Sequence, residues 1–127
     1  MYFNLENYKL LCKAIKNGED VADDTEIVND IMNHCVQYVN SVAAHEKTLE
    51  LIRFRYESDE LIRRIEEVDH LRRAVHNVAI GNCNIINRLA NSYGVGEIFT
   101  GNANNRYEVA NFCGEVSEMM STIKSIN

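Results

Sequence analysis

Apolar positions that alternate in steps of three and four residues run through most of the chain, as they do in helices that bury one side. One such seam spans residues 28–56 and a second spans residues 61–89. The first comprises Val28, Met32, Cys35, Val39, Val42, Glu46, Leu49, Arg53 and Tyr56, and the second Leu61, Ile65, Val68, Arg72, Val75, Ala79, Asn82, Ile86 and Leu89. This heptad period predicts two long helices, over about 25–57 and 59–93.

The two seams match one another if the chain reverses near Ser58. Folding it there places Val42 opposite Val75, and the other seam positions pair in the same register. Glu46 then faces Arg72, so we expect an ion pair that fixes the register. The alternative is one unbroken helix, since no Gly or Pro interrupts the segment. We favour an antiparallel hairpin, because helices of that length are rare in small domains.

Shorter elements flank the predicted hairpin. An apolar stripe predicts a helix over about residues 4–16, which Asn17 and Gly18 end. The first long helix is expected to begin near Asp24 or Thr25, because both residue types make good N-caps.

After the hairpin, residues 94–104 carry three Gly and two Asn, which predicts a loop. Its apolar residues, expected to tuck against the bundle, are Val95, Ile98 and Phe99. Asn105 and Glu108 have the spacing of a capping box. A C-terminal helix is therefore predicted over about residues 105–125.

Together these elements define an all-α helical bundle built on a long hairpin, in one domain over residues 1–127. With no Pro and only six Gly, the chain lacks the turn residues of a sandwich or barrel. Long hairpins with little cover often complete their core by association, so we expect a homo-oligomer.

The net charge of −6 argues against a protein that covers extended DNA. No segment has the pattern of a signal peptide or the length of a membrane span, so we expect a cytoplasmic protein. The cysteines, none of them in a C-x-x-C pair, are Cys12, Cys35, Cys83 and Cys113. We interpret all four as buried, reduced thiols and expect neither a metal nor a cofactor.

The second face of the predicted 59–93 helix carries the most informative chemistry. Around Arg73 it presents a polar stripe, with Glu66, Asp69, His76, Asn77, Asn84, Asn87 and Arg88 within about 60° of it. Residues 48–123 contain eight Arg and no Lys, and arginine is the side chain that grips carboxylate and phosphate in a bidentate manner. Asp69 is placed to orient Arg73, and Arg106 adds a cation where the last helix begins.

This stripe has two interpretations. As a binding surface, Asp69, Arg73, His76, Asn77, Asn84, Asn87, Arg88 and Arg106 would hold an anionic ligand or a partner protein. As a solvated face, it would reflect only that the chain is rich in asparagine, with 16 Asn.

Two other patterns point to catalysis or to metal binding. Arg64 and His70 resemble the Arg-x(4–6)-His motif of the HEPN family of helical ribonucleases, and that resemblance implies an RNase in which Arg64 binds the scissile phosphate and His70 assists transfer. The residue after the arginine, Ile65, departs from the polar residue that this family prefers. Glu67 and His70 have the spacing of half a di-iron site, but no second motif completes it.

Two segments also carry a family resemblance. The run from Val68 to Arg88 and the run from Gly101 to Phe112 resemble a family of short bacterial and phage proteins of unknown function, over about residues 53–127. The positions shared are Asp69, Arg73, His76, Asn87, Arg88 and Arg106. The resemblance implies a phage or mobile-element origin and no assigned activity.

From residues and resemblance together, we expect a non-enzymatic, oligomeric binding protein. Small acidic helical phage proteins resemble, as a class, antagonists of host defence that sequester an anionic nucleotide signal or bind a host protein. The alternatives are the HEPN-like ribonuclease and a structural or regulatory oligomer without a small ligand.

Overall fold

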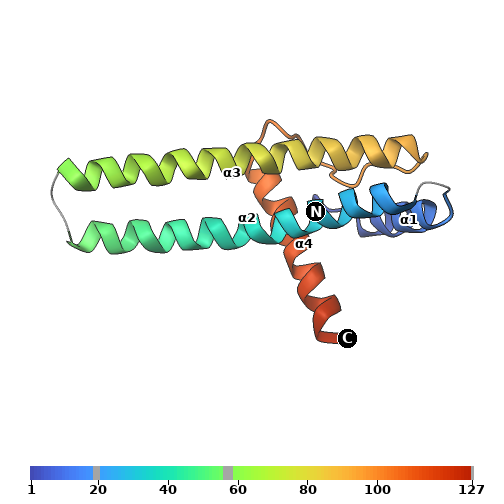
Figure 1. Cartoon of the computed structure of the whole chain (residues 1–127), viewed down its shortest axis with the longest axis horizontal. Helices are drawn as coiled ribbons and strands as arrows, with labels where there is room; N and C mark the ends of the chain where they lie inside the picture. The colour runs from blue at the N-terminus through green and yellow to red at the C-terminus, as the bar shows by residue number, and fades with distance from the viewer. Residues whose placement is uncertain (19–20, 56–58, 127) are drawn as a thin grey trace.

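A computed structural model describes residues 1–18, 21–55 and 59–126, and over these ranges the chain is all-α, as predicted. Its helices are α1 (Leu5–Lys16), α2 (Val21–Arg55), α3 (Asp59–Ser92) and α4 (Arg106–Ile126). Figure 1 shows α2 and α3 side by side as a long antiparallel hairpin. Helix α1 lies beside the N-terminal end of α2, and α4 crosses the hairpin. The alternative of one unbroken helix is therefore wrong. The reversal at Ser58 lies outside the described residues.

The short helix α1 begins and ends as its sequence predicts. The side chain of Asn4 caps it by accepting a 3.0 Å hydrogen bond from the backbone N–H of Asn7. Glu6 near its start and Lys16 near its end complement the helix dipole. The N–H of Gly18 donates to the carbonyl of Ile15 and closes the last turn.

The start of α2 differs from the prediction. The helix begins at Val21, so Asp24 lies inside its first turn and is not the N-cap. Acidic residues suit that turn because they face the positive end of the helix dipole. The carboxylate of Asp24 has another partner, since it accepts a hydrogen bond from the hydroxyl of Tyr93 at the end of α3.

The core forms where α4 crosses the hairpin. There one side of α4 meets the two predicted seams. The core includes Val28, Met32, Cys35, Ala79, Ile86, Val109, Phe112, Cys113 and Val116, all of them buried. The hairpin extends well beyond this crossing, and α4 does not cover that part (Figure 1). The predicted ion pair between Glu46 and Arg72 is not formed, and both side chains lie exposed.

The loop after α3 packs as predicted, with Ile98 and Phe99 fully buried or nearly so. Phe3 and Phe99 form an isolated antiparallel β-bridge, which ties the N-terminal residues to this loop. The carboxylate of Glu115 accepts hydrogen bonds of 2.9 and 2.7 Å from the N–H groups of Tyr2 and Phe3. The first residues are therefore fixed to both the loop and α4.

The four cysteines are free, but they do not all share one environment. Cys35, Cys83 and Cys113 are buried, whereas Cys12 is only partly buried, so the expectation of four buried thiols is wrong for Cys12. Burial raises the pKa of Cys83 to about 12. Within the described ranges, no helix combines the length and the apolar character needed to cross a bilayer.

Candidate functional site

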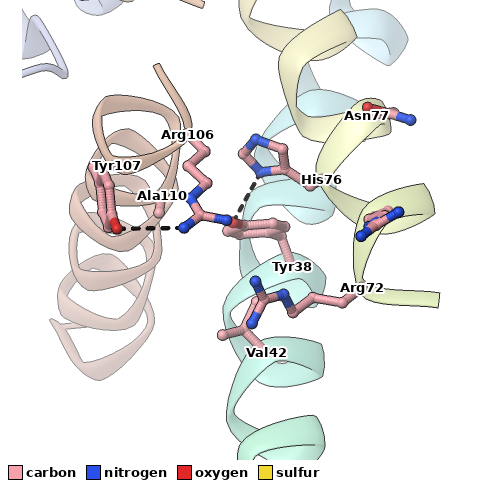
Figure 2. Close-up of a pocket in the computed structure, with 9 residues that line it drawn as sticks. Tyr38, Val42, Arg72, His76, Asn77, Arg106, Tyr107 and Ala110 are labelled. Carbon is pink, nitrogen blue, oxygen red and sulfur yellow. Dashed lines mark hydrogen bonds between the residues drawn. The ribbon is translucent and has the colours of Figure 1, made fainter. Parts of the chain in front are cut away.

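A pocket of about 360 Å³ lies where α2, α3 and α4 meet, on the side of the hairpin that α4 crosses. Its walls are Tyr38 and Val42 from α2, Arg72, Arg73, His76 and Asn77 from α3, and Arg106, Tyr107 and Ala110 from α4. Figure 2 shows the side chain of Arg106 reaching from α4 toward Tyr38 and His76. The pocket thus unites residues that lie far apart along the chain.

Helical spacing explains why α3 supplies four of the lining residues. Arg72 and His76 are four positions apart, as are Arg73 and Asn77, so the two pairs form adjacent rows on one side of the helix. Three of these four side chains end in groups that donate hydrogen bonds in a pH-independent way, and His76 is the exception.

Arg106 lies at the start of α4 and lines the pocket from there. Asn105 caps this helix, because its side-chain oxygen accepts from the N–H groups of Tyr107 and Glu108 at 3.0 and 3.4 Å. Only half of the predicted capping box forms, since the N–H of Asn105 donates to the carbonyl of Asn102. The cap fixes the first turn of α4 and therefore the backbone position from which the Arg106 side chain extends.

Arg106 and Tyr107 form a unit at the mouth of the pocket. The guanidinium of Arg106 lies 5.2 Å from the centre of the Tyr107 ring and donates a 3.4 Å hydrogen bond to its hydroxyl. This hydrogen bond, together with the positive charge of Arg106, lowers the pKa of Tyr107. Tyr107 as a whole is 68% exposed, so its ring is accessible to a ligand.

His76 and Tyr38 form the floor of the pocket. The Tyr38 hydroxyl and Nδ1 of His76 are 3.2 Å apart and share a hydrogen bond. Burial lowers the pKa of His76, and the charges of Arg106 and Arg72 lower it further. Burial also raises the pKa of Tyr38. At neutral pH the pair is therefore uncharged, and the positive charge of the pocket comes from its arginines.

The lowered pKa of His76 predicts that part of the stability of the folded chain is lost at acidic pH. Because its folded pKa lies below the unfolded value, the unfolded chain binds a proton first as the pH falls. This component of stability is complete above the unfolded pKa and is lost as the pH falls from there toward the folded pKa. In thermal melts over that interval, we expect His76→Gln to lose less stability on acidification than the wild type. Equal losses would contradict a depressed pKa for this histidine.

Four of the eight residues that the sequence singled out line this pocket, namely Arg73, His76, Asn77 and Arg106. The other five lining residues were not predicted to bind a ligand. Val42 and Arg72 were assigned to the seams, and no pattern in the sequence pointed to Tyr38, Tyr107 or Ala110. A signal for Arg72 was present, because it lies four residues before His76 on the same side of the helix.

Asn84, Asn87 and Arg88 lie elsewhere, in a shallow depression beside the loop that follows α3. The Asn87 side chain is engaged within the chain. Its oxygen accepts from the N–H groups of Ile98 and Phe99 at 3.0 and 2.9 Å, and its nitrogen donates to the carbonyl of Phe99 at 2.9 Å. Asn87 therefore holds the loop in place.

Asp69 does not orient Arg73, since no ion pair joins them and Asp69 is not among the residues that line the pocket. Within the single chain, the two residues of the ribonuclease hypothesis do not share a pocket. Arg64 makes an exposed 3.4 Å ion pair with Glu60, and His70 lies in a shallow hollow that does not include Arg64. Over the described residues, no three His, Cys, Asp or Glu side chains form a group suited to a metal ion.

Fold and pocket together define a small helical protein in which a long hairpin, crossed by a C-terminal helix, carries an arginine-lined pocket. The chain belongs to the family described as "Protein of unknown function (DUF3232)", which matches residues 3–124. This match confirms the family resemblance seen in the sequence and extends it to the N-terminal helix. Comparisons with curated proteins and with solved structures find no match.

Proposed function

We propose that this chain is a non-enzymatic binding protein that holds a small anionic nucleotide in the pocket between α2, α3 and α4. One observation carries the proposal: Arg72, Arg73 and Arg106 line one pocket, and none of its nine lining residues is acidic. Guanidinium groups offer fixed, paired donors that match the oxygens of phosphate.

The charge of the whole chain makes this pocket unusual. With 13 basic and 19 acidic residues, the chain is acidic, so a random patch of its surface is expected to be negative. Three arginines without a carboxylate repel one another, and a bound anion relieves that repulsion. The capped start of α4 adds the positive end of a helix dipole to the same place.

The uncharged part of the lining favours a nucleotide over a simple inorganic anion. Tyr38 and Tyr107 supply aromatic rings, and Val42 and Ala110 supply apolar surface, against which a base can lie. Asn77 offers both a donor and an acceptor for a base edge. The volume of about 360 Å³ falls in the usual range for small-molecule sites.

A protein that binds a nucleotide without transforming it can act by lowering the free concentration of that nucleotide. This fits a cytoplasmic antagonist, of the kind some phages carry, that removes the nucleotide signal of a host defence. That biological setting is an analogy between classes of protein. The proposed binding chemistry is supported by the residues that line the pocket.

A thermal-shift panel tests the proposal. We expect nucleoside phosphates, including cyclic dinucleotides, to raise the melting temperature, because a ligand that binds only the folded state stabilises it by mass action. At a concentration about 100 times Kd the gain is about 2.7 kcal/mol. Adenosine, which lacks phosphate, is expected to give no comparable shift. A panel in which no phosphate-bearing ligand shifts the melting would refute the proposal.

Matched arginine variants locate the site. Arg73→Ala and Arg106→Ala remove pocket guanidinium groups and are expected to weaken nucleotide binding at least tenfold, which corresponds to about 1.4 kcal/mol for each lost contact. Arg64→Ala is the control, because Arg64 is an exposed arginine on α3 that pairs with Glu60 and lies outside the pocket. Equal affinities for Arg73→Ala and Arg64→Ala would place binding elsewhere.

A further inference from the structure

The side of α3 that faces away from the pocket exposes three large apolar side chains. Leu71 is 54% exposed, Val78 48% and Ile85 45%. Single exposed apolar residues are common on protein surfaces and need no explanation. These three are seven residues apart, however, so they form one straight row at the heptad spacing of helices that pack lengthwise.

A second row runs beside the first at the same spacing. It consists of Glu67, Ala74, Gly81 and Arg88, with small residues in the middle and opposite charges at the two ends. A Cβ added at Gly81 would meet nothing within 4 Å, so packing inside the chain does not require this glycine. Glycine in the middle of a helix costs about 1 kcal/mol relative to alanine. Small residues at this spacing let a second helix approach closely.

We infer that this face of α3 packs against the same face of a second copy of the chain. The two α3 helices lie antiparallel about a two-fold axis near Val78. An interface of this kind is isologous, because one surface serves both subunits. It is independent of the nucleotide pocket, since Arg73 lies about 140° around the helix axis from Val78.

The register of this pairing follows from the positions alone. With the axis at Val78, Leu71 faces Ile85 of the second copy, because each lies seven residues from the axis. Ala74 lies near Gly81 of the second copy, which leaves room for close contact. The ends of the second row then meet as Glu67 against Arg88 of the second copy. At 1.5 Å of rise per residue these two positions differ by only about 1.5 Å along the axis.

The charges are what select a second copy in antiparallel orientation. A parallel pair of α3 helices would place Glu67 beside Glu67 and Arg88 beside Arg88, which repel. The antiparallel pair forms two Glu67–Arg88 contacts by symmetry, and such charge patterns set orientation in helix pairs. Both side chains are exposed in the single chain and free to pair across the axis.

Sedimentation equilibrium of the full chain tests this inference. We expect a species of twice the 14.5 kDa chain mass at high micromolar concentration. Val78→Arg, which places two charges at the axis, is expected to give a monomer with an unchanged circular dichroism spectrum. Ile62→Arg is the matched control, because Ile62 is 58% exposed on the same helix but about 160° away from Val78. It is expected to remain a dimer.

Charge reversal supplies a test that misfolding cannot imitate. Glu67→Arg and Arg88→Glu should each weaken the dimer at least tenfold, and the double variant should restore it, because the opposite charges then meet again. A monomeric wild type, a Val78→Arg dimer, or a double variant no tighter than the singles would overturn the inference. None of these outcomes depends on nucleotide binding.

Discussion

Replacement of Phe112 by alanine is expected to lower the free energy of unfolding by about 3–5 kcal/mol. Phe112 on α4 has no exposed surface. Its ring meets the edges or faces of Phe3 at 5.8 Å and of Phe99 at 5.1 Å between ring centres, at interplanar angles of 66° and 72°. The alanine would leave a cavity at the point where the N-terminal residues, the loop and α4 meet.

Urea unfolding followed by circular dichroism measures this loss. Since a small domain is stable by only about 5–15 kcal/mol, the midpoint should fall steeply or the variant should be unfolded at 37 °C. Ile123→Ala on the same helix is the control, because Ile123 is 49% exposed and its truncation should cost about 0.5 kcal/mol or less. Similar midpoints for the two variants would contradict the position of Phe112 in the core.

Asn87→Ala is expected to cost about 2–4 kcal/mol, which is the second largest effect we predict. The substitution removes three hydrogen bonds to the loop after α3. It leaves the N–H groups of Ile98 and Phe99 without their side-chain partner, in residues that are almost completely buried. A buried backbone group that loses its partner costs about 1–3 kcal/mol.

Asn84→Ala separates this structural role from a general effect of the polar stripe. Asn84 is three residues away on α3, is exposed, and lines the same depression. We expect its replacement to change the stability by about 0.5 kcal/mol or less. If both variants unfolded at the wild-type denaturant concentration, the Asn87 side chain would not be holding the loop. Hydrogen exchange at Ile98 and Phe99 would report the same contacts directly.

The hairpin was predictable because its signal is long and repetitive. A heptad pattern over more than 60 residues indicates both helices, and the agreement of the two seams indicates that the chain turns back between them. The start of α2 was missed by a few residues, because Asp24 is a residue type that often caps helices but lies inside the first turn of this one. The hydrogen bond between Asp24 and Tyr93 spans 69 positions, so no local sequence pattern predicts it.

The pocket was only partly predictable, for a similar reason. The four α3 residues share one helix face, so spacing alone groups Arg73, His76 and Asn77. Which residues of α2 and α4 face that group depends on the angle at which α4 crosses the hairpin. The positions of Tyr38 and Tyr107 in the site therefore became visible only in the three-dimensional structure. Asn87 was misread as a candidate ligand because a side chain that binds a loop has the same polarity as one that binds a nucleotide.

The contact between Phe3 and Glu115 has a consequence for how the chain matures. The hydrogen bond between them spans 112 positions. Because translation proceeds from the N-terminus, the hairpin can form on the ribosome, whereas this closure must wait until α4 has left the exit tunnel. Until then Phe3 can contact Tyr8 and Phe99 but lacks its partners on α4, Phe112 and Glu115. The contacts of Tyr2 and Phe3 with α4 therefore form only after α4 has been synthesised.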